Sequence, residues 1–193
     1  MLKTQKFLFI AALVFFIACN KAKRDDAQYL AFASQAMQDV MPQMMQTVKQ
    51  EVDKNGYASA VTFCSGFAAE FGKNKNVEWG KLATHDINAK SFRFRRISEK
   101  NRNPNNRADA KQSVILAQWL KEGATPTLYR DGTRVTTMHP IKISMPMCLG
   151  CHGDAATVDK KAIGEIKRLY PNDLATGYKL GDLRGAFVTE IEL

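Results

Sequence analysis

Two cysteines and a histidine stand close together near the C-terminal end of the chain, in the segment Cys148-Leu149-Gly150-Cys151-His152. A Cys-x-x-Cys-His segment is the attachment signature of c-type haem, in which the thiols add to the haem vinyl groups and the histidine binds the iron. A disulfide or half of a zinc site is the alternative. Zinc would need two further ligands, and the remaining candidates are not arranged as a pair: Cys19, Cys64, His85 and His139. The motif therefore predicts one covalent haem.

The N-terminus has the features of an export signal. Lys3 and Lys6 precede an apolar run over residues 7–18, which suits a signal peptide and is shorter than the roughly twenty residues of a transmembrane helix. Residues 16–19 (FIAC) resemble a lipobox, so residues 1–18 are predicted to be a lipoprotein signal peptide and Cys19 to carry the lipid. Ordinary cleavage that leaves a free thiol, or an uncleaved anchor, is the alternative. We expect an exported protein of the periplasm or cell envelope.

The rest of the chain is long enough for one domain with a substantial core. Residues 19–27 are short and charged, and are predicted to be a tether; residues 28–193 are predicted to form the domain. The formal net charge is +9 and falls by two when Lys3 and Lys6 leave with the signal peptide. In an exported protein this charge favours an anionic partner surface, anionic lipid or the haem propionates, and no nucleic-acid partner is predicted.

The first half of the domain is predicted to be helical. Asp25-Asp26 can cap a helix that ends at Asn55-Gly56, and Pro42 is expected to kink or interrupt it. Its methionines recur at helical spacing, which is more typical of an adaptable core than of a copper site. A second helix over about residues 57–71 places Cys64 on an apolar face among aromatic residues. Taken alone, this position favours Cys64 as a small buried hydrophobe, and iron ligation is the alternative.

The second half is predicted to form a mainly antiparallel sheet with short helices between the strands. Alternating or turn-flanked segments give the strands, namely 90–98, the hairpin 128–135 with Asp131-Gly132 at its tip, and 186–193. Helices are expected at about 109–121 and 159–170, and the first should turn Val114, Ala117 and Leu120 inward. Helices followed by such a sheet indicate the α+β class.

Several motifs, in order along the chain, resemble the PAS-like c-type haem domain family, long catalogued as a domain of unknown function. They are residues 60–64 (AVTFC), 96–98 (RIS) leading to 102–106 (RNPNN), 148–153 (CLGCHG), and 170–175 (YPNDLA) with 177–185 (GYKLGDLRG). These motifs cover nearly all of the chain after the predicted signal peptide. Because they occur together, the resemblance is more specific than the haem signature alone.

The resemblance implies a PAS-like sheet preceded by helices, and one haem c whose iron is bound by the motif histidine and a cysteine on an N-terminal helix. Those positions match His152 and Cys64. A thiolate ligand would stabilise ferric iron and lower the reduction potential. The competing ligands are Met138, Met145, Met147, His85 and His139.

Arginines near the family's Arg-Asn-Pro turn are candidates to pair the haem propionates, since arginine binds carboxylates in a bidentate way. Arg96 and Arg102 are the predicted cofactor-binding residues, with Arg93 and Arg95 beside them in sequence. The alternative is that the strand arginines face solvent.

The predicted function is that of an exported, membrane-tethered c-type cytochrome with a single haem, which carries electrons or senses redox state or small gases through a protein partner. In the resembling family the domain also occurs as an extracytoplasmic input module of signalling proteins. The alternative is a haem enzyme, peroxidase-like or oxidising sulfur compounds. Iron with two axial ligands leaves no substrate position, and no acid–base pair other than His85 and His139 stands out. No catalytic residue is therefore predicted.

Overall fold

The computed structural model describes the backbone of residues 4–193 and the side chains of residues 26–193. The predicted lipidation site Cys19 lies outside the described side chains, as does most of the predicted signal peptide and tether, so these remain predictions. Among the described residues, no helix is both long and apolar enough to cross a bilayer.

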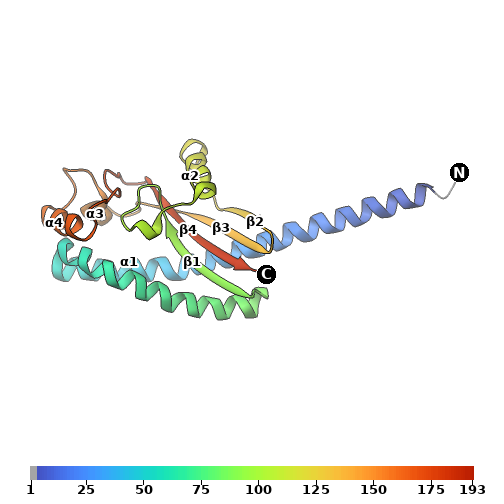
Figure 1. The fold of residues 1–193 in the computed structure, drawn as a ribbon, viewed down its shortest axis with the longest axis horizontal. Helices are drawn as coiled ribbons and strands as arrows, with labels where there is room; N and C mark the ends of the chain where they lie inside the picture. The colour runs from blue at the N-terminus through green and yellow to red at the C-terminus, as the bar shows by residue number, and fades with distance from the viewer. Residues whose placement is uncertain (1–3) are drawn as a thin grey trace.

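Helix α1 (Thr4–Ile87) folds back on itself and forms a long hairpin of two arms (Figure 1). The break is at Gly56, whose φ of 81° lies in the region that favours glycine. The predicted helix end at Asn55-Gly56 is therefore confirmed. The helix continues through Pro42, so the interruption that was one of the two outcomes expected there does not occur. The helix also begins before Asp25-Asp26, and Asp26 pairs with Arg130 instead of capping it.

The second arm of α1 extends well beyond the predicted end at residue 71. Contacts with other elements hold the polar stretch that follows. The side chain of Asn76 bonds both the N–H and the C=O of Phe94, while Lys75 and Trp79 both donate to Asp39 of the first arm at 2.9 Å. Tertiary bonding thus overrides the weak helical propensity of this segment.

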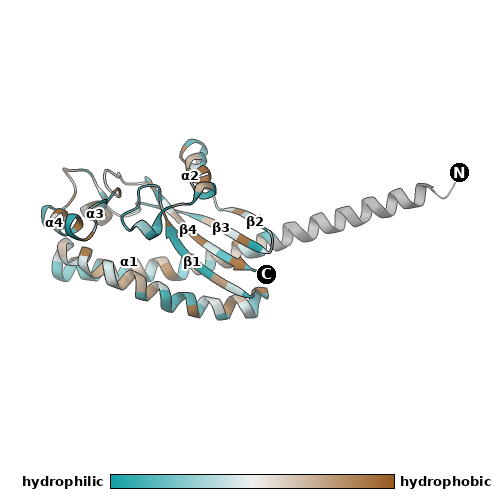
Figure 2. Ribbon diagram, in the orientation of Figure 1, coloured by the Kyte–Doolittle hydropathy of each residue, from teal (hydrophilic) through white to brown (hydrophobic). Residues whose placement is uncertain are grey.

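The sheet is four-stranded and antiparallel, in the order β1-β4-β3-β2 (Figure 1). Its strands are β1 (Ser91–Ile97), β2 (Thr127–Asp131), β3 (Arg134–Lys142) and β4 (Leu183–Glu192). Both apolar and polar residues occur along the strands (Figure 2). They alternate in β1, whereas the middle of β3 and the middle of β4 are buried without alternation. One face packs on the α1 hairpin through Phe92, Phe94, Val135, Phe187 and Ile191. This confirms the α+β class and is consistent with a PAS-like sheet.

The opposite face of the sheet is covered by α2 (Ala110–Glu122), which Asp109 and Gln112 start with a reciprocal capping box. The predicted inward face of this helix is wrong: Val114 and Leu120 are 68% and 69% exposed, and Ala117 is exposed too. Leu116 and Trp119 are buried instead. The apolar ring of Trp119 packs with Leu116 in a cluster that includes Met138 and Val188 of the sheet.

The remaining elements are short and follow the sheet's hairpin. They are the 3₁₀ turns η1 (Pro104–Asn106) and η2 (Pro146–Cys148), α3 (Leu149–His152) and α4 (Lys160–Leu169). Helix α4 is held against α1 by a small apolar cluster that includes Val61, Ala162 and Ile166. The bend of the α1 hairpin, α3 and α4 therefore gather at one end of the molecule (Figure 1).

His139 of β3 is buried at 4% exposure, and its Nε2 has no hydrogen-bond partner among the described residues. Burial lowers the pKa of this imidazole, so the unfolded chain binds a proton below about pH 6.5 that the folded chain does not. The stabilising contribution is complete above that pH and is lost as the pH falls toward the lowered folded pKa. The slope for one such group is at most about 1.4 kcal/mol per pH unit.

We therefore expect the free energy of unfolding to decrease from about pH 7 to about pH 5, and His139→Phe to reduce that slope. Urea unfolding of both proteins at each pH measures the difference. Equal slopes in the two proteins would show that His139 does not titrate on unfolding.

Candidate haem site

The Cys-x-x-Cys-His segment forms the end of η2 and all of α3. Gly150 is buried at its centre, and a Cβ at this position would lie 2.3 Å from the ring carbons of Tyr57. Any other residue at this position would require the Tyr57 ring to move. Cys148 and Cys151 are free, half-buried thiols on either side of Gly150. The local packing thus favours glycine here and leaves both thiols unpaired.

The imidazole of His152 is fixed by a single hydrogen bond. Its Nδ1 lies 2.8 Å from the carbonyl oxygen of Ala175, and the ring of Tyr178 meets it edge-on with 6.3 Å between centroids. Burial, and then the charges of nearby arginines, lower the pKa of His152 well below its usual value. The ring is therefore neutral, with a proton on Nδ1 that the carbonyl accepts, and Nε2 is left for a metal.

Cys64, on the second arm of α1, is brought to the same end of the molecule. It is half-buried, and its thiol interacts electrostatically with Arg96, Arg102 and Cys151. Burial raises the pKa of the Cys64 thiol, while the two arginines oppose that increase. A metal cation at this position would favour the thiolate further. The predicted second ligand thus lies near the haem-attachment motif.

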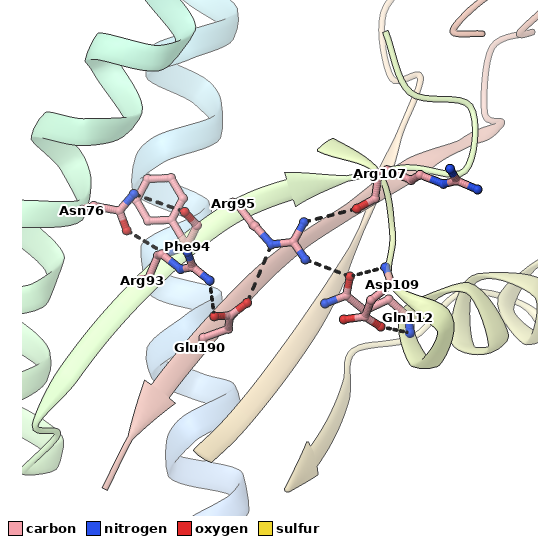
Figure 3. A network of polar contacts seen from close by, with 8 residues as sticks. All are labelled: Asn76, Arg93, Phe94, Arg95, Arg107, Asp109, Gln112 and Glu190. Atoms are coloured by element: carbon pink, nitrogen blue, oxygen red, sulfur yellow. Dashed lines mark hydrogen bonds and ion pairs between the residues drawn. The ribbon is translucent and has the colours of Figure 1, made fainter. Parts of the chain in front are cut away.

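The strand arginines separate by the alternation of β1. Arg93 and Arg95 point to the α2 face of the sheet, where both contact Glu190 and Arg95 also donates to Gln112 at 3.0 Å (Figure 3). Arg96 lies on the opposite face, which packs on α1, in register with Phe187 of β4. The structure therefore leaves only Arg96 of the three on the side of Cys64.

The side chain of Arg96 is half-buried, and its guanidinium has no hydrogen bond or ion pair with the other described residues. Burial lowers the pKa of its guanidinium, opposed by the charges of Cys64 and Tyr170. A buried cation without a counter-charge is costly. A propionate would supply that charge.

Arg102 is bonded to protein groups instead. Its Nε and Nη2 hold the two carboxylate oxygens of Asp173 at 3.2 and 3.0 Å, and Nη2 also donates to the carbonyl of Cys151 at 2.6 Å. The guanidinium of Arg102 therefore links the Cys-x-x-Cys-His segment to the loop that contains Asp173. Its predicted pairing with a propionate remains a prediction.

Sequence reasoning gave no specific role to Tyr178 and Arg184, which complete the surroundings of His152. Two cations lie over the ring of Tyr178, with Lys100 Nζ 4.4 Å and the Arg184 guanidinium 5.4 Å from its centroid. Arg184 also donates to the carbonyl of Lys100 at 3.1 Å. Both residues belong to the GYKLGDLRG motif, and this motif is the sequence feature that could have indicated their place beside His152.

The competing ligands are placed less favourably. Met138 is buried on the α2 face of the sheet, away from Cys64. His85 is exposed and its Nδ1 lies 2.6 Å from Asp86, and His139 is enclosed in the sheet. Met145 and Met147 are half-buried within the turn before Cys148.

The residues present fit haem c by the chemistry of their donors. Two free thiols stand at the attachment spacing, a neutral imidazole is held through Nδ1, a third thiol lies near, and an arginine on the same side has no counter-charge. The described residues contain no cluster of three or more His, Cys, Asp or Glu side chains that could hold a metal ion.

Comparison with known proteins gives a family. The family model described as Tll0287-like matches residues 18–191, which is most of the chain. One solved structure, described as the crystal structure of the cyanobacterial heme-protein Tll0287, is 22% identical; the match covers 82% of this chain and 95% of that chain, with a TM-score of 0.49. No curated protein matches the chain. On the family match, this chain belongs to the Tll0287-like family.

Proposed function

We propose that the chain holds one haem c, attached through Cys148 and Cys151, with His152 and Cys64 as axial ligands. The observation that carries this proposal is the bond from His152 Nδ1 to Ala175, which fixes the ring and leaves Nε2 free beside two unpaired thiols. Membership of a family that includes a protein described as a heme-protein supports it. The spacing of the motif supports thioether attachment.

When bound, the haem supplies one-electron oxidation and reduction of its iron. The residues of the chain set the conditions for that chemistry. Cys64 would provide an anionic sulfur donor, which favours the ferric state, and Arg96 would provide a cation for a propionate. His152 would provide a neutral donor whose proton stays on Nδ1.

The proposed role is electron transfer, or redox or gas sensing, through a protein partner. The protein would act outside the cytoplasm, with residues 1–18 as signal peptide, residues 19–27 as tether, residues 28–193 as the haem domain and Cys19 as lipid anchor. If His152 and Cys64 both bind the iron, a substrate would have to displace one of them, which favours a carrier or a sensor over an enzyme.

A spectrum of the reduced protein with and without carbon monoxide tests this role. Full-length protein produced with a c-haem maturation system should contain one haem per chain by the pyridine haemochrome assay. A carrier should keep both ligands and ignore carbon monoxide, whereas a gas sensor should bind it. Turnover of added peroxide would contradict both roles and favour the enzyme.

The lipid anchor is tested separately by Cys19→Ser. Without the acceptor thiol, the protein should move from the membrane fraction to the soluble exported fraction. Fractionation and immunoblotting measure the distribution, with Cys64→Ser as the matched control that keeps the anchor. A Cys19→Ser protein that stays in the membrane fraction would reject lipidation as the tether.

A further inference from the structure

The groups that hold His152 form a closed ring of hydrogen bonds around a buried ion pair. We propose that Arg102 and Asp173 are positioning residues for His152, which fix its hydrogen bond to Ala175 and thereby tune the reduction potential of the iron. This inference rests on the proposed haem site and goes beyond it, because neither residue would touch the iron.

The ring can be followed bond by bond. His152 Nδ1 lies 2.8 Å from the Ala175 oxygen, and the Ala175 N–H donates to Asp173 Oδ1 at 2.9 Å. Asp173 in turn accepts from Arg102, at 3.2 Å from Nε and 3.0 Å from Nη2. Arg102 Nη2 closes the ring by donating to the carbonyl of Cys151, the residue before His152, at 2.6 Å. The ring of hydrogen bonds thus joins three segments: the turn before η1, helix α3, and the loop after α4.

The Arg102–Asp173 ion pair is buried, which suits a role in positioning the groups bonded to it. The side chains of Arg102 and Asp173 are 13% and 7% exposed, much less than those of the surface pairs of the described chain. A buried ion pair contributes little net stability, because desolvation offsets the attraction, but it can fix the geometry of the groups bonded to it. Arginine suits this position because its planar fork serves a carboxylate and a carbonyl together.

The ring also touches the acceptor of the histidine proton. Arg102 Nη2 lies 3.4 Å from the Ala175 oxygen, so the same carbonyl faces two donors. A shared acceptor takes less of the Nδ1 proton, and this makes His152 a weaker donor to iron. Asp173 adds a negative charge next to the cation. The two side chains should therefore act on the potential in opposite directions.

The test compares reduction potentials of full-length, haem-loaded variants. Asp173→Asn keeps the shape but leaves the cation uncompensated, so the potential should shift to more positive values. Arg102→Met removes the cation and the competing donor, so the potential should shift to more negative values. The double variant should lie between the two single variants. Shifts of the same sign in both single variants would overturn the proposal, since general loosening of the site predicts that result.

Arg102→Lys separates positioning from charge. It keeps the cation but lacks the fork that shares the Ala175 carbonyl, so the potential should shift to more negative values, by less than in Arg102→Met. The ferric signals measured by electron paramagnetic resonance should broaden as His152 loses its fixed orientation. Unchanged signals would show that charge alone acts and would reject positioning. Arg95→Lys, in the network of Figure 3 on the other face of the sheet, is the matched control and should change neither quantity.

The haem-free chain offers a measurement that does not depend on loading. The Nδ1 proton of His152 should exchange slowly with solvent in wild type and faster in Arg102→Lys, as followed by NMR of ¹⁵N-histidine-labelled protein. Equal exchange rates would overturn the positioning role. Absence of bound haem in the wild-type protein would instead reject the proposed function, so the two failures are distinguishable.

Discussion

Replacement of Cys64 by alanine should leave one coordination position of the haem iron without a protein ligand. If Cys64 supplies a thiolate, the variant should lose the sulfur-to-iron charge-transfer bands of the ferric spectrum, and its reduction potential should rise because an anionic donor is gone. The vacated position should bind carbon monoxide in the ferrous state. Absorption spectra, a redox titration and carbon monoxide binding measure the three effects on one preparation.

The matched control is a substitution on the same arm of α1 that does not replace a cysteine. Phe67→Leu alters the same arm of α1 near Cys64 without removing a sulfur donor, and it should leave all three properties close to wild type. Unchanged ferric spectra and potential in Cys64→Ala would reject Cys64 as a ligand. The thiol would then be the small, half-buried hydrophobe that its helix position alone suggests.

Replacement of Arg96 by methionine should have opposite effects on the haem-free and haem-loaded proteins. In the haem-free chain the half-buried guanidinium has no partner among the described residues, so removing it should stabilise the fold by about 1 to 3 kcal/mol. In the loaded protein it should weaken the site, because a propionate would lose its cation. Urea unfolding of both forms measures the two changes, with Cys148→Ser/Cys151→Ser as the haem-free background.

Arg95→Met is the control for this prediction. Arg95 donates to Gln112 and faces Glu190 on the other face of the sheet from Cys64, so its loss should destabilise both forms by a similar amount (Figure 3). Destabilisation of the haem-free chain by Arg96→Met would contradict the claim that the Arg96 guanidinium lacks a counter-charge until a propionate binds.

Local sequence patterns predicted where helices and strands lie more reliably than which of their faces is buried. Strand alternation located β1, and the glycine at residue 56 marked the bend of α1, because backbone preferences act over a few residues. The inward face of α2 could not be predicted in this way. Val114 and Leu120 satisfy a helical stripe as well as Leu116 and Trp119 do, and only the facing sheet decides between them.

The site shows the same division. The attachment motif can be read from its spacing, since its chemistry is local. The separation of Arg96 from Arg95 follows from strand alternation, but the ion pair of Arg102 with Asp173 depends on two loops that meet only in the fold. Tyr178 beside His152 is likewise a tertiary contact. The sequence alone could therefore name candidate arginines but could not say which had a partner.

Retention of haem under denaturing conditions tests the central claim most directly. Full-length protein produced with a c-haem maturation system is extracted with acidified acetone, and the haem remaining in the protein pellet is measured. Thioether bonds to Cys148 and Cys151 predict that wild type keeps its haem and that Cys148→Ser/Cys151→Ser loses it. Wild-type protein that releases its haem into the acetone would contradict covalent attachment, and with it the proposed haem c site.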